Sequence, residues 1–362
     1  MRGMNPSTSN VPNLFVEHRP VGFPATLQPA PELEAPKTLS ELVASFDRLE
    51  VLHHPDIDVP VRALAMTERA SIIVPDLGPC TLTPWAKKQL ASRLGIQWDR
   101  WFDGIDGKLR ADEVNRRLSG DDGKLRLKTT LGAGDDAESV ATLRGFVSTS
   151  YATISDSTVA QTVLEELRAG DSRLVRHSTT DCTTSYVVRI GAPFHVGGPA
   201  QVGDVVGGLL VRNSDVGYAS LVIALHVTRL VCRNGMVVAQ DKAIIHRAHR
   251  RIDMEDLKQK LATGLRDLPS RIQRAARALE RSAHHRVESV EAAMVEVLRL
   301  ARVPQRRLPL FVVAYEKEPH ASPFGIAQAI TLGAQDPKVS AEERIALEQA
   351  AGEYVQRFAA VT

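Results

Sequence analysis

The stretch RLVCRNGMVV, residues 229–238, has the pattern of a β-hairpin. Apolar residues flank the dipeptide Asn234-Gly235, which suits a two-residue type I′ turn because both residue types tolerate positive φ. The sequence therefore predicts that residues 218–230 and 235–243 form adjacent antiparallel strands joined at this dipeptide.

The hairpin closes a run of segments that have the composition of β-strands. Because several of these segments are separated by short loops that contain glycine or proline, we expect neighbouring strands to pair antiparallel in one sheet. The predicted strands are residues 172–179, 184–191, 205–212, 218–230 and 235–243.

Two helices with clear end signals precede this run. Thr83 and Pro84 suit the cap and the first position of a helix, and Gly95 suits its exit. Asp156 is predicted to cap a second helix that ends at Gly170, directly before the strands. Two further strands are predicted from KLRLKTTL and RGFVSTSYATI, which are residues 124–131 and 144–154.

The last third of the chain is predominantly helical. Residues 269–303 form one long amphipathic pattern, and two more helices are predicted at about 322–334 and 340–360. Ser340 with Glu343 has the spacing of a capping box for the last helix. The predicted fold class is therefore α+β, with an antiparallel sheet that contains an inserted helix, followed by a helical C-terminal region.

The punctuation of the chain predicts three regions. Residues 1–38 contain seven prolines and are expected to form an extended or disordered arm. Residues 39–252 are expected to form the α+β core domain, and residues 253–362 the helical C-terminal region.

Composition is that of a globular protein, with 43% hydrophobic and 24% charged residues among 362. The formal net charge is only +2, so any nucleic-acid site must come from local clustering of charge. Cys80, Cys182 and Cys232 lie far apart, and we expect them to form neither a metal site nor a disulfide. No apolar run is long enough for a membrane span, and a cytoplasmic location is expected.

Catalytic signatures for nucleotide-binding loops, metalloproteases and serine hydrolases are missing, so no catalytic residue, metal or cofactor is assigned. The segment HHPDID, residues 53–58, is the best candidate for a metal site, with a solvated loop as the alternative. In IIHRAHRR, residues 244–251, the arginines would repel a metal ion and favour an anion. Tyr151, Tyr186 and Tyr218 are the candidate rings for stacking on bases.

A basic cluster lies at the end of the strand region and can be read in two ways. It either binds phosphate groups or forms a solvated junction that pairs with nearby acids. Arg229 would continue the apolar face of its strand, so either a bulge near Thr228 shifts the register or the arginine leaves the core edge to meet an acid. The residues of the predicted patch are Arg229, Arg233, Arg247, Arg250 and Arg251.

A second basic stripe follows the predicted long helix. Arg274, Arg277 and Arg281 fall within about 80° of one another and of Arg266 at 100° per residue. The stripe is either an ordinary solvated face or a rail that tracks a phosphate backbone.

Four segments together resemble the phage/plasmid-like family of unknown function. They are LTPWAKKQLASRLGI, GFVSTSYATI, LLVRNSDVGYASL and TRLVCRNGMVV. The resemblance rests on an Asn-Ser-acid-x-Gly turn at residues 213–217 and an Arg-x-x-Cys-x-Asn-Gly hairpin at residues 229–235, and it extends over about residues 80–250. It implies a setting in the DNA metabolism of mobile elements, without a reaction or a catalytic residue.

The expected function is non-enzymatic DNA binding, with single-stranded DNA as the partner and a homo-oligomer as the working form, in annealing, recombination or replication. One alternative is a metal-dependent DNA-processing enzyme such as a nuclease. The other is an antirestriction or structural protein-interaction module.

Overall fold

The computed structural model describes residues 36–98, 100–131, 141–167, 172–196, 203–229, 235–237, 244–249 and 253–359. The fold is α+β, as predicted, and the described part of the chain forms eleven α-helices and two β-sheets. The five-strand path of the second sheet was expected from the sequence, whereas its strands β9 and β13 were not.

The first sheet has six strands in the order β1-β5-β6-β4-β3-β2, and only the β4–β6 pair is parallel. Its strands are β1 (Ile57–Pro60), β2 (Ala65–Met66), β3 (Ile72–Val74), β4 (Gly78–Leu82), β5 (Lys124–Thr130) and β6 (Thr142–Val147), and a 3-10 helix spans Val61–Ala63. Three helices lie between β4 and β5 in the chain: α2 (Pro84–Leu94), α3 (Arg100–Gly104) and α4 (Gly107–Ser119). Together they enclose the N-terminal core, which includes Ile72, Leu90, Leu118, Leu127 and Leu143.

Helix α2 has the ends that its sequence predicts. The Thr83 hydroxyl accepts a hydrogen bond from the Ala86 amide at 3.2 Å, and Pro84 is the first helical residue. Gly95 ends the helix with a φ of 63°, in the left-handed region that favours glycine. The strand predicted from RGFVSTSYATI is shorter than expected, because β6 ends at Val147 and a turn follows in which the Tyr151 amide donates to the Ser148 carbonyl.

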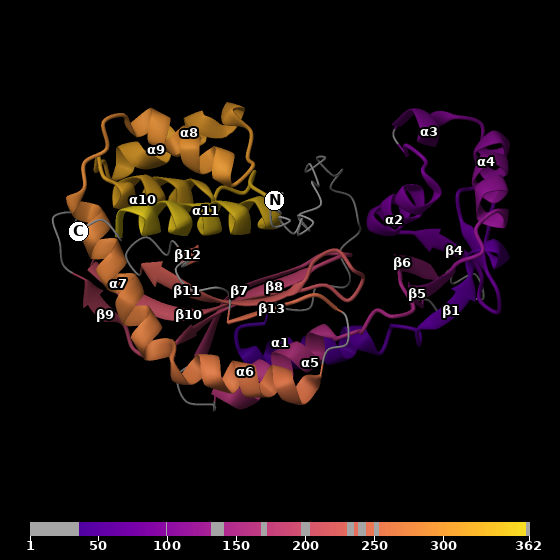
Figure 1. Cartoon of the computed structure of the whole chain (residues 1–362), viewed down its shortest axis with the longest axis horizontal. Coiled ribbons are helices and arrows are strands. Elements are labelled where there is room, and N and C mark those ends of the chain that lie inside the picture. The colour runs from indigo at the N-terminus through magenta and orange to yellow at the C-terminus, as the bar shows by residue number, and fades with distance from the viewer. Residues whose placement is uncertain are drawn as a thin grey trace, which may run out of the picture. The chain divides into compact units, whose positions relative to one another are not determined.

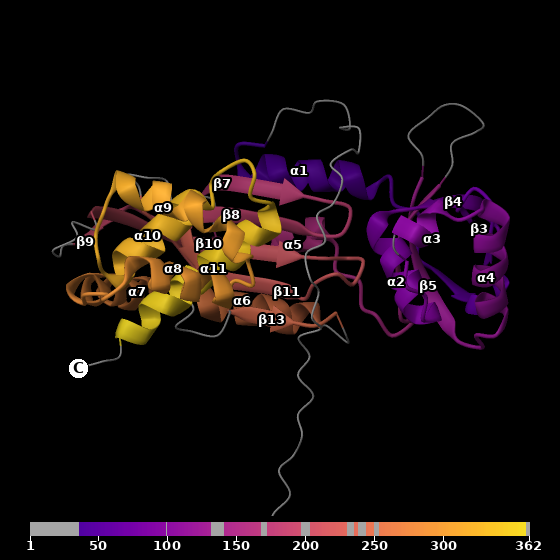
Figure 2. The same ribbon diagram turned by 90° about the horizontal axis from the view of Figure 1, so that it is seen from above.

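The described strands of the second sheet are antiparallel and run in the order β12-β11-β10-β8-β7. Figure 2 shows β7, β8, β10 and β11 in succession. Strand β9 also pairs with β10, and β13 pairs with the same strand, β11, as β12 does. The strands are β7 (Ser172–Thr179), β8 (Thr184–Ile190), β9 (Phe194–Val196), β10 (Gly203–Asn213), β11 (Leu221–Arg229), β12 (Gly235–Val237) and β13 (Ile245–Arg247). The predicted antiparallel run of strands is thus confirmed.

Helices cover both faces of this sheet (Figure 1). One face carries α1 (Leu39–Glu50), α5 (Asp156–Leu167) and α6 (Met254–Arg266), and α7 (Leu268–His284) leads from α6 to the helices of the other face. Those helices are α8 (Val290–Leu300), α9 (Leu308–Lys317), α10 (Pro323–Gly333) and α11 (Ala341–Ala359), with a 3-10 helix at Gln305–Arg307. The large core that results includes Leu42, Val163, Leu209, Ile223, Leu261, Phe311, Ile330 and Leu347.

A buried ion pair joins the last helix to the sheet. Arg176 on β7 donates to the Glu348 carboxylate on α11 at 2.6 Å, and the carboxylate is fully buried. Burial alone would raise the pKa of Glu348, but His226 and Arg176 hold it at about 2. The capping box predicted for α11 is confirmed, since the Ser340 hydroxyl and the Glu343 carboxylate bond each other's backbone amides.

The long helix predicted over residues 269–303 is wrong, because the chain breaks after α7. His285 is extended, with φ −79° and ψ 142°. Ser289 then caps α8 by accepting a hydrogen bond from the Ala292 amide at 3.2 Å. The amide of Val287 bonds outside the helix, to the Ala321 carbonyl. A serine cap and this tertiary bond therefore override a hydrophobic period that continues across the break.

The predicted hairpin has the right strands and the wrong turn. Strands β11 and β12 are antiparallel neighbours, but Thr228 is the partner of Gly235 in the ladder. A two-residue turn at Asn234-Gly235 would instead place Arg233 opposite Met236. Because Gly235 itself pairs in the sheet, the turn does not lie at Asn234-Gly235, and residues 230–234 and 238–243 lie outside the described residues.

The alternative of a bulge near Thr228 is also wrong. The ladder between β10 and β11 runs without a shift from Val205 opposite Arg229 to Arg212 opposite Val222. Arg229 therefore stays in register, and the reading in which it leaves the core edge to meet an acid stays a prediction.

Candidate functional site

The Asn213–Gly217 turn connects β10 to β11 and lies at the centre of a buried polar network. The Ser214 hydroxyl accepts a hydrogen bond from the Tyr218 amide at 2.9 Å, which closes the turn. Gly217 has a φ of 79°, and a Cβ there would lie 3.2 Å from Val147 Cγ1. Glycine is needed at this position for both reasons.

The same turn binds helix α2 of the N-terminal core. Trp85 Nε1 and Gln89 Nε2 both donate to the Val216 carbonyl, at 3.0 and 2.9 Å. Gln89 also accepts from the Phe146 amide of β6 at 2.9 Å. The turn between β10 and β11 of the second sheet is therefore anchored to α2, and Gln89 of α2 is in turn bonded to β6 of the first sheet.

Asp215 forms a bidentate ion pair with Arg144 of β6, with both N–O distances at 2.8 Å. Burial alone would raise the pKa of Asp215, but the charge and hydrogen bonds of Arg144 hold it below its ordinary value. The Arg144 guanidinium also lies 3.3 Å from His53 Nδ1. Burial and this guanidinium lower the pKa of His53 to about 4, so the imidazole is neutral at pH 7.

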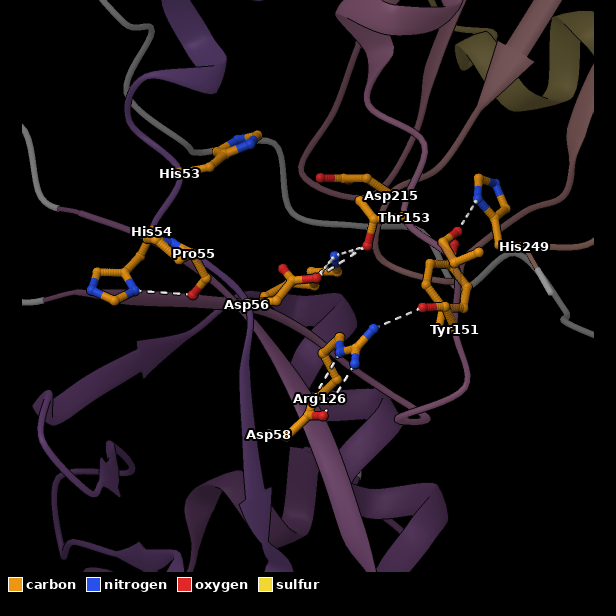
Figure 3. A network of polar contacts seen from close by, with 12 residues as sticks. His53, His54, Pro55, Asp56, Asp58, Arg126, Tyr151, Thr153, Asp215 and His249 are labelled. Atoms are coloured by element: carbon orange, nitrogen blue, oxygen red, sulfur yellow. Dashed lines mark hydrogen bonds and ion pairs between the residues drawn. The ribbon is translucent and has the colours of Figure 1, made fainter. Parts of the chain in front are cut away.

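The HHPDID segment is part of this network, and its acids are paired with cations (Figure 3). Asp56 accepts from the buried Lys128 ammonium at 2.6 Å, and burial lowers the pKa of Lys128. Asp58 forms an ion pair with Arg126 at 2.7 Å. Among the described residues no three side chains of His, Cys, Asp or Glu are grouped so that they could hold a metal ion.

Asp156 lies at the first position of α5, beside the turn. The prediction that it caps this helix is wrong, because the Ser155 hydroxyl accepts from the Thr158 amide and so performs the capping. Asp156 instead accepts a hydrogen bond from Asn213 Nδ2 at 2.8 Å and another from Thr184. Burial and the neighbouring charge of Asp215 raise the pKa of Asp156 to about 6.

A cavity of about 220 Å³ lies between these groups. Its lining comes from α1 and the segment after it, from β5 and β6, from the first turn of α5, from the β7–β8 connection and from the Asn213–Gly217 turn. The polar lining includes His53, Arg144, Asp156, Asp215 and the hydroxyls of Thr130, Ser155, Ser157, Thr179, Thr180, Thr183, Thr184 and Ser214. A carboxyl with a pKa of about 6 can exchange protons near neutral pH, so this arrangement can bind a ligand and move a proton.

The predicted basic residues whose side chains are described, Arg247, Arg274, Arg277 and Arg281, do not line the cavity. Arg247 is exposed at the end of β13 and forms an ion pair with Asp256 at 3.2 Å, as its solvated-junction reading predicts. Arg229 is placed by its backbone only, and Arg233, Arg250 and Arg251 lie outside the described residues. The stripe residues Arg274, Arg277 and Arg281 are exposed on α7.

The candidate tyrosines are engaged inside the protein. Tyr186 is buried against Phe46, and Tyr218 packs edge-on against Trp85 with ring centroids 4.9 Å apart. Tyr151 stacks on His249 at 5.0 Å, and its hydroxyl donates to the Ser214 carbonyl. The three rings therefore pack against other side chains of the protein, and the Tyr151 hydroxyl bonds the Asn213–Gly217 turn.

Two of the three cysteines lie in described segments. Cys80 and Cys182 are free and buried, and burial raises the pKa of both thiols, to about 12 for Cys182. Cys232 lies outside the described residues.

The fold and the site define an α+β protein whose buried polar network is organised by one tight turn. Residues 144–306 match the family model of DUF932, a domain of unknown function. The match includes Arg144, Asp156 and the Asn213–Gly217 turn. A comparison with curated proteins and one with solved structures found no match. None of the helices in the described ranges is both long and apolar enough to cross a membrane.

Proposed function

We propose that the protein binds single-stranded DNA without chemical turnover, as a homo-oligomer, in the service of a mobile element. The observation that supports this proposal best is the composition of the exposed side of α7. The resemblance to the phage/plasmid-like family supports DNA as the partner.

Helix α7 carries four arginines and a single acid, Glu280. Its buried face packs into the large core through Ala275, Leu279 and Ala283. Three of the arginines, which we call the α7 rail, are exposed: Arg274, Arg277 and Arg281. Guanidinium groups on one exposed side of a helix suit phosphate oxygens, which they bind in a bidentate manner.

The length of the α7 rail limits how many phosphates one subunit can bind. Arg274 and Arg281 are seven positions apart, so the rail is about 10 Å long, which is enough for only a few phosphates. A single rail therefore gives weak binding. Strong binding needs either a second basic surface on the same subunit or the rails of several subunits along one DNA strand. The proposed second contact surface is Arg229, Arg233, Arg247, Arg250 and Arg251.

The proposal is tested by fluorescence anisotropy with a 40-nucleotide single strand and the matching duplex, over a salt titration. The test variant replaces Arg274, Arg277 and Arg281 with Gln. We expect the slope of log affinity against log salt to become shallower by up to about 2, because each phosphate that an arginine neutralises on a single strand contributes about 0.7. Affinity should fall equally for all sequences, because phosphate contacts carry no base information.

The matched control removes the same number of charges from exposed residues of the N-terminal region. It replaces Arg69, Lys108 and Lys124 with Gln. Equal salt slopes for the rail variant and the wild type would exclude the rail. Cleavage of DNA that depends on Mg²⁺ or Mn²⁺ would favour the nuclease instead. If the wild type binds no DNA at low salt, the protein-interaction module becomes the better reading.

A further inference from the structure

The cavity beside the Asn213–Gly217 turn has two chemically different walls. The apolar part of the lining comes from α1 and the segment directly after it. It consists of Phe46 and Leu49 on α1, and Leu52. Hydroxyl and carboxylate oxygens supply much of the remaining lining, from the start of α5, the β7–β8 connection and the turn. Such a cavity suits a small molecule with one polar end and one apolar end.

The charges that line the cavity are unequal. The acids Glu50, Asp156 and Asp215 face a single permanent cation, Arg144, and His53 is neutral at pH 7. Arg144 is already held by both oxygens of Asp215, so it is not available to a ligand carboxylate or phosphate. Lys128 does not line the cavity and is paired with Asp56. An anionic ligand would therefore meet an excess of negative charge.

The helix ends at the cavity do not reverse this balance. Helix α5 directs its positive N-terminal end toward the cavity, while α1 ends there at Glu50 with its negative C-terminal end. The two dipoles act in opposite directions and offset each other. The side-chain charges therefore decide which ligands are favoured.

We propose that this cavity binds a small organic ammonium ion, with its charged nitrogen at Asp156 and its hydrocarbon part against Phe46 and Leu49. An ammonium group has three N–H donors, and the wall at Asp156 offers carboxylate and hydroxyl acceptors for them. The cavity volume of about 220 Å³ is suited to a small ligand. This proposal is independent of DNA binding by the α7 rail.

Binding of a cation should release a proton near pH 6. The groups around Asp156 are Asp215 and Arg144, the amide of Asn213, the hydroxyl of Thr184, and Tyr151 and Tyr186. His53, with a pKa of about 4, and Asp215, with a lowered pKa, are both deprotonated at pH 6. A bound ammonium favours the ionised form of Asp156, whose pKa of about 6 leaves it half protonated in the free protein.

The experiment is isothermal titration calorimetry of the full chain with n-butylammonium at constant ionic strength, with n-butanol and butyrate as matched neutral and anionic probes. We expect butylammonium to bind at least tenfold more tightly than butanol, and butyrate not to bind. Titrations at pH 6 in two buffers of different ionisation enthalpy should show proton release, and titrations at pH 8 should show none.

Asp156→Asn should weaken butylammonium binding at least tenfold and abolish the proton release. The control Asp58→Asn removes an acid that is paired with Arg126 outside the cavity, and it should leave binding unchanged. Should Asp156→Asn fail to fold by circular dichroism, the exposed Glu50→Gln is the second variant, with a severalfold loss expected. Butyrate or butanol binding as tightly as butylammonium overturns the proposal, as does the lack of binding at 20 mM butylammonium.

Discussion

The ion pair between Arg144 and Asp215 holds two nearly buried charges, with side chains that are 16% and 13% exposed. Removing one partner leaves the other charge buried without compensation. We expect Asp215→Asn to lower the free energy of unfolding by about 3 kcal/mol, measured by urea denaturation. The control is Asp58→Asn, which removes a 44% exposed acid from a surface pair and should cost less than about 1 kcal/mol. Equal losses in the two variants would contradict the central role of the Asp215 pair.

Asp156 has the opposite pH dependence from Asp215. Its folded-state pKa of about 6 lies above the ordinary value of 3.8, so the folded protein holds this proton more tightly than the unfolded chain. The resulting stabilisation is fully present below pH 3.8 and is lost as the pH rises through 6. The wild type should therefore lose up to about 3 kcal/mol in free energy of unfolding between pH 4 and 7, whereas Asp156→Asn should not show this loss. Urea denaturation of both proteins over this pH range measures the difference. The same difference in free energy of unfolding between variant and wild type at every pH would contradict the prediction.

At the scale of single elements, β10 contains two adjacent glycines that face different obstacles. A Cβ on Gly208 would lie 2.1 Å from the Val188 carbonyl oxygen, which is backbone of the paired strand β8. A Cβ on Gly207 would lie 2.0 Å from Ile272 Cδ1, the end of a side chain on α7. Because a side chain can rotate and a paired backbone cannot, Gly208→Ala should cost about 3 kcal/mol and Gly207→Ala about 1 kcal/mol. Thermal unfolding of the two variants checks the order, and a larger loss for Gly207→Ala would refute it.

Elements with local signals could be predicted from the sequence. The strands of the second sheet alternate or are rich in β-branched residues, and α2 carries its own cap and exit residues. The hairpin turn was missed because Asn234-Gly235 is a strong local turn signal, whereas the ladder to Thr228 sets the register. The break after α7 was missed because Ser289 reads as an ordinary helix residue unless its cap bond is seen.

Of the candidate site, only the central Asn213–Gly217 turn could be predicted from the sequence. The Asn213–Gly217 turn was visible as a motif, and it organises the network. The partners of Asp215 and Asp156 come from distant segments, such as Arg144 on β6 and Thr184 on β8. Such pairs depend on the tertiary fold, and neither charge patterning nor periodicity in one sequence reveals them.

At the scale of the whole molecule, the two largest hydrophobic cores of the described residues are coupled at one turn, through polar contacts and a small apolar cluster of Trp85, Cys182 and Val216. All three tryptophans, Trp85, Trp98 and Trp101, belong to the N-terminal segment, so their fluorescence reports on that region. Far-UV circular dichroism reports mainly on the helices around the large core, from α1 and from α5 to α11. Because Trp85 also contacts Val216 and Tyr218 at the turn, the two signals weight the two cores differently, and Trp98 and Trp101 report on the N-terminal segment.

Gln89→Ala removes the hydrogen bond to Val216 that couples the cores, and a second one to Phe146 within the N-terminal core. In the wild type we expect the fluorescence and dichroism transitions in urea to coincide. In the variant we expect the fluorescence midpoint to fall about 0.5 M below the dichroism midpoint, since about 1 kcal/mol of coupling is removed. The control Gln161→Ala changes an exposed glutamine on α5 and should keep the midpoints together. Coincident midpoints in Gln89→Ala would show that the cores do not depend on this coupling.

The large core is built from residues on both sides of the segment that matches DUF932. Leu42 and Phe46 of α1 precede residues 144–306, and Phe311, Ile330 and Leu347 follow them. A gene fusion that transferred only the matched segment would leave the apolar faces of the second sheet without these partners, and its product would aggregate. The piece of coding sequence that can be exchanged between replicons and still yield a folded protein is therefore longer than the piece that sequence comparison detects.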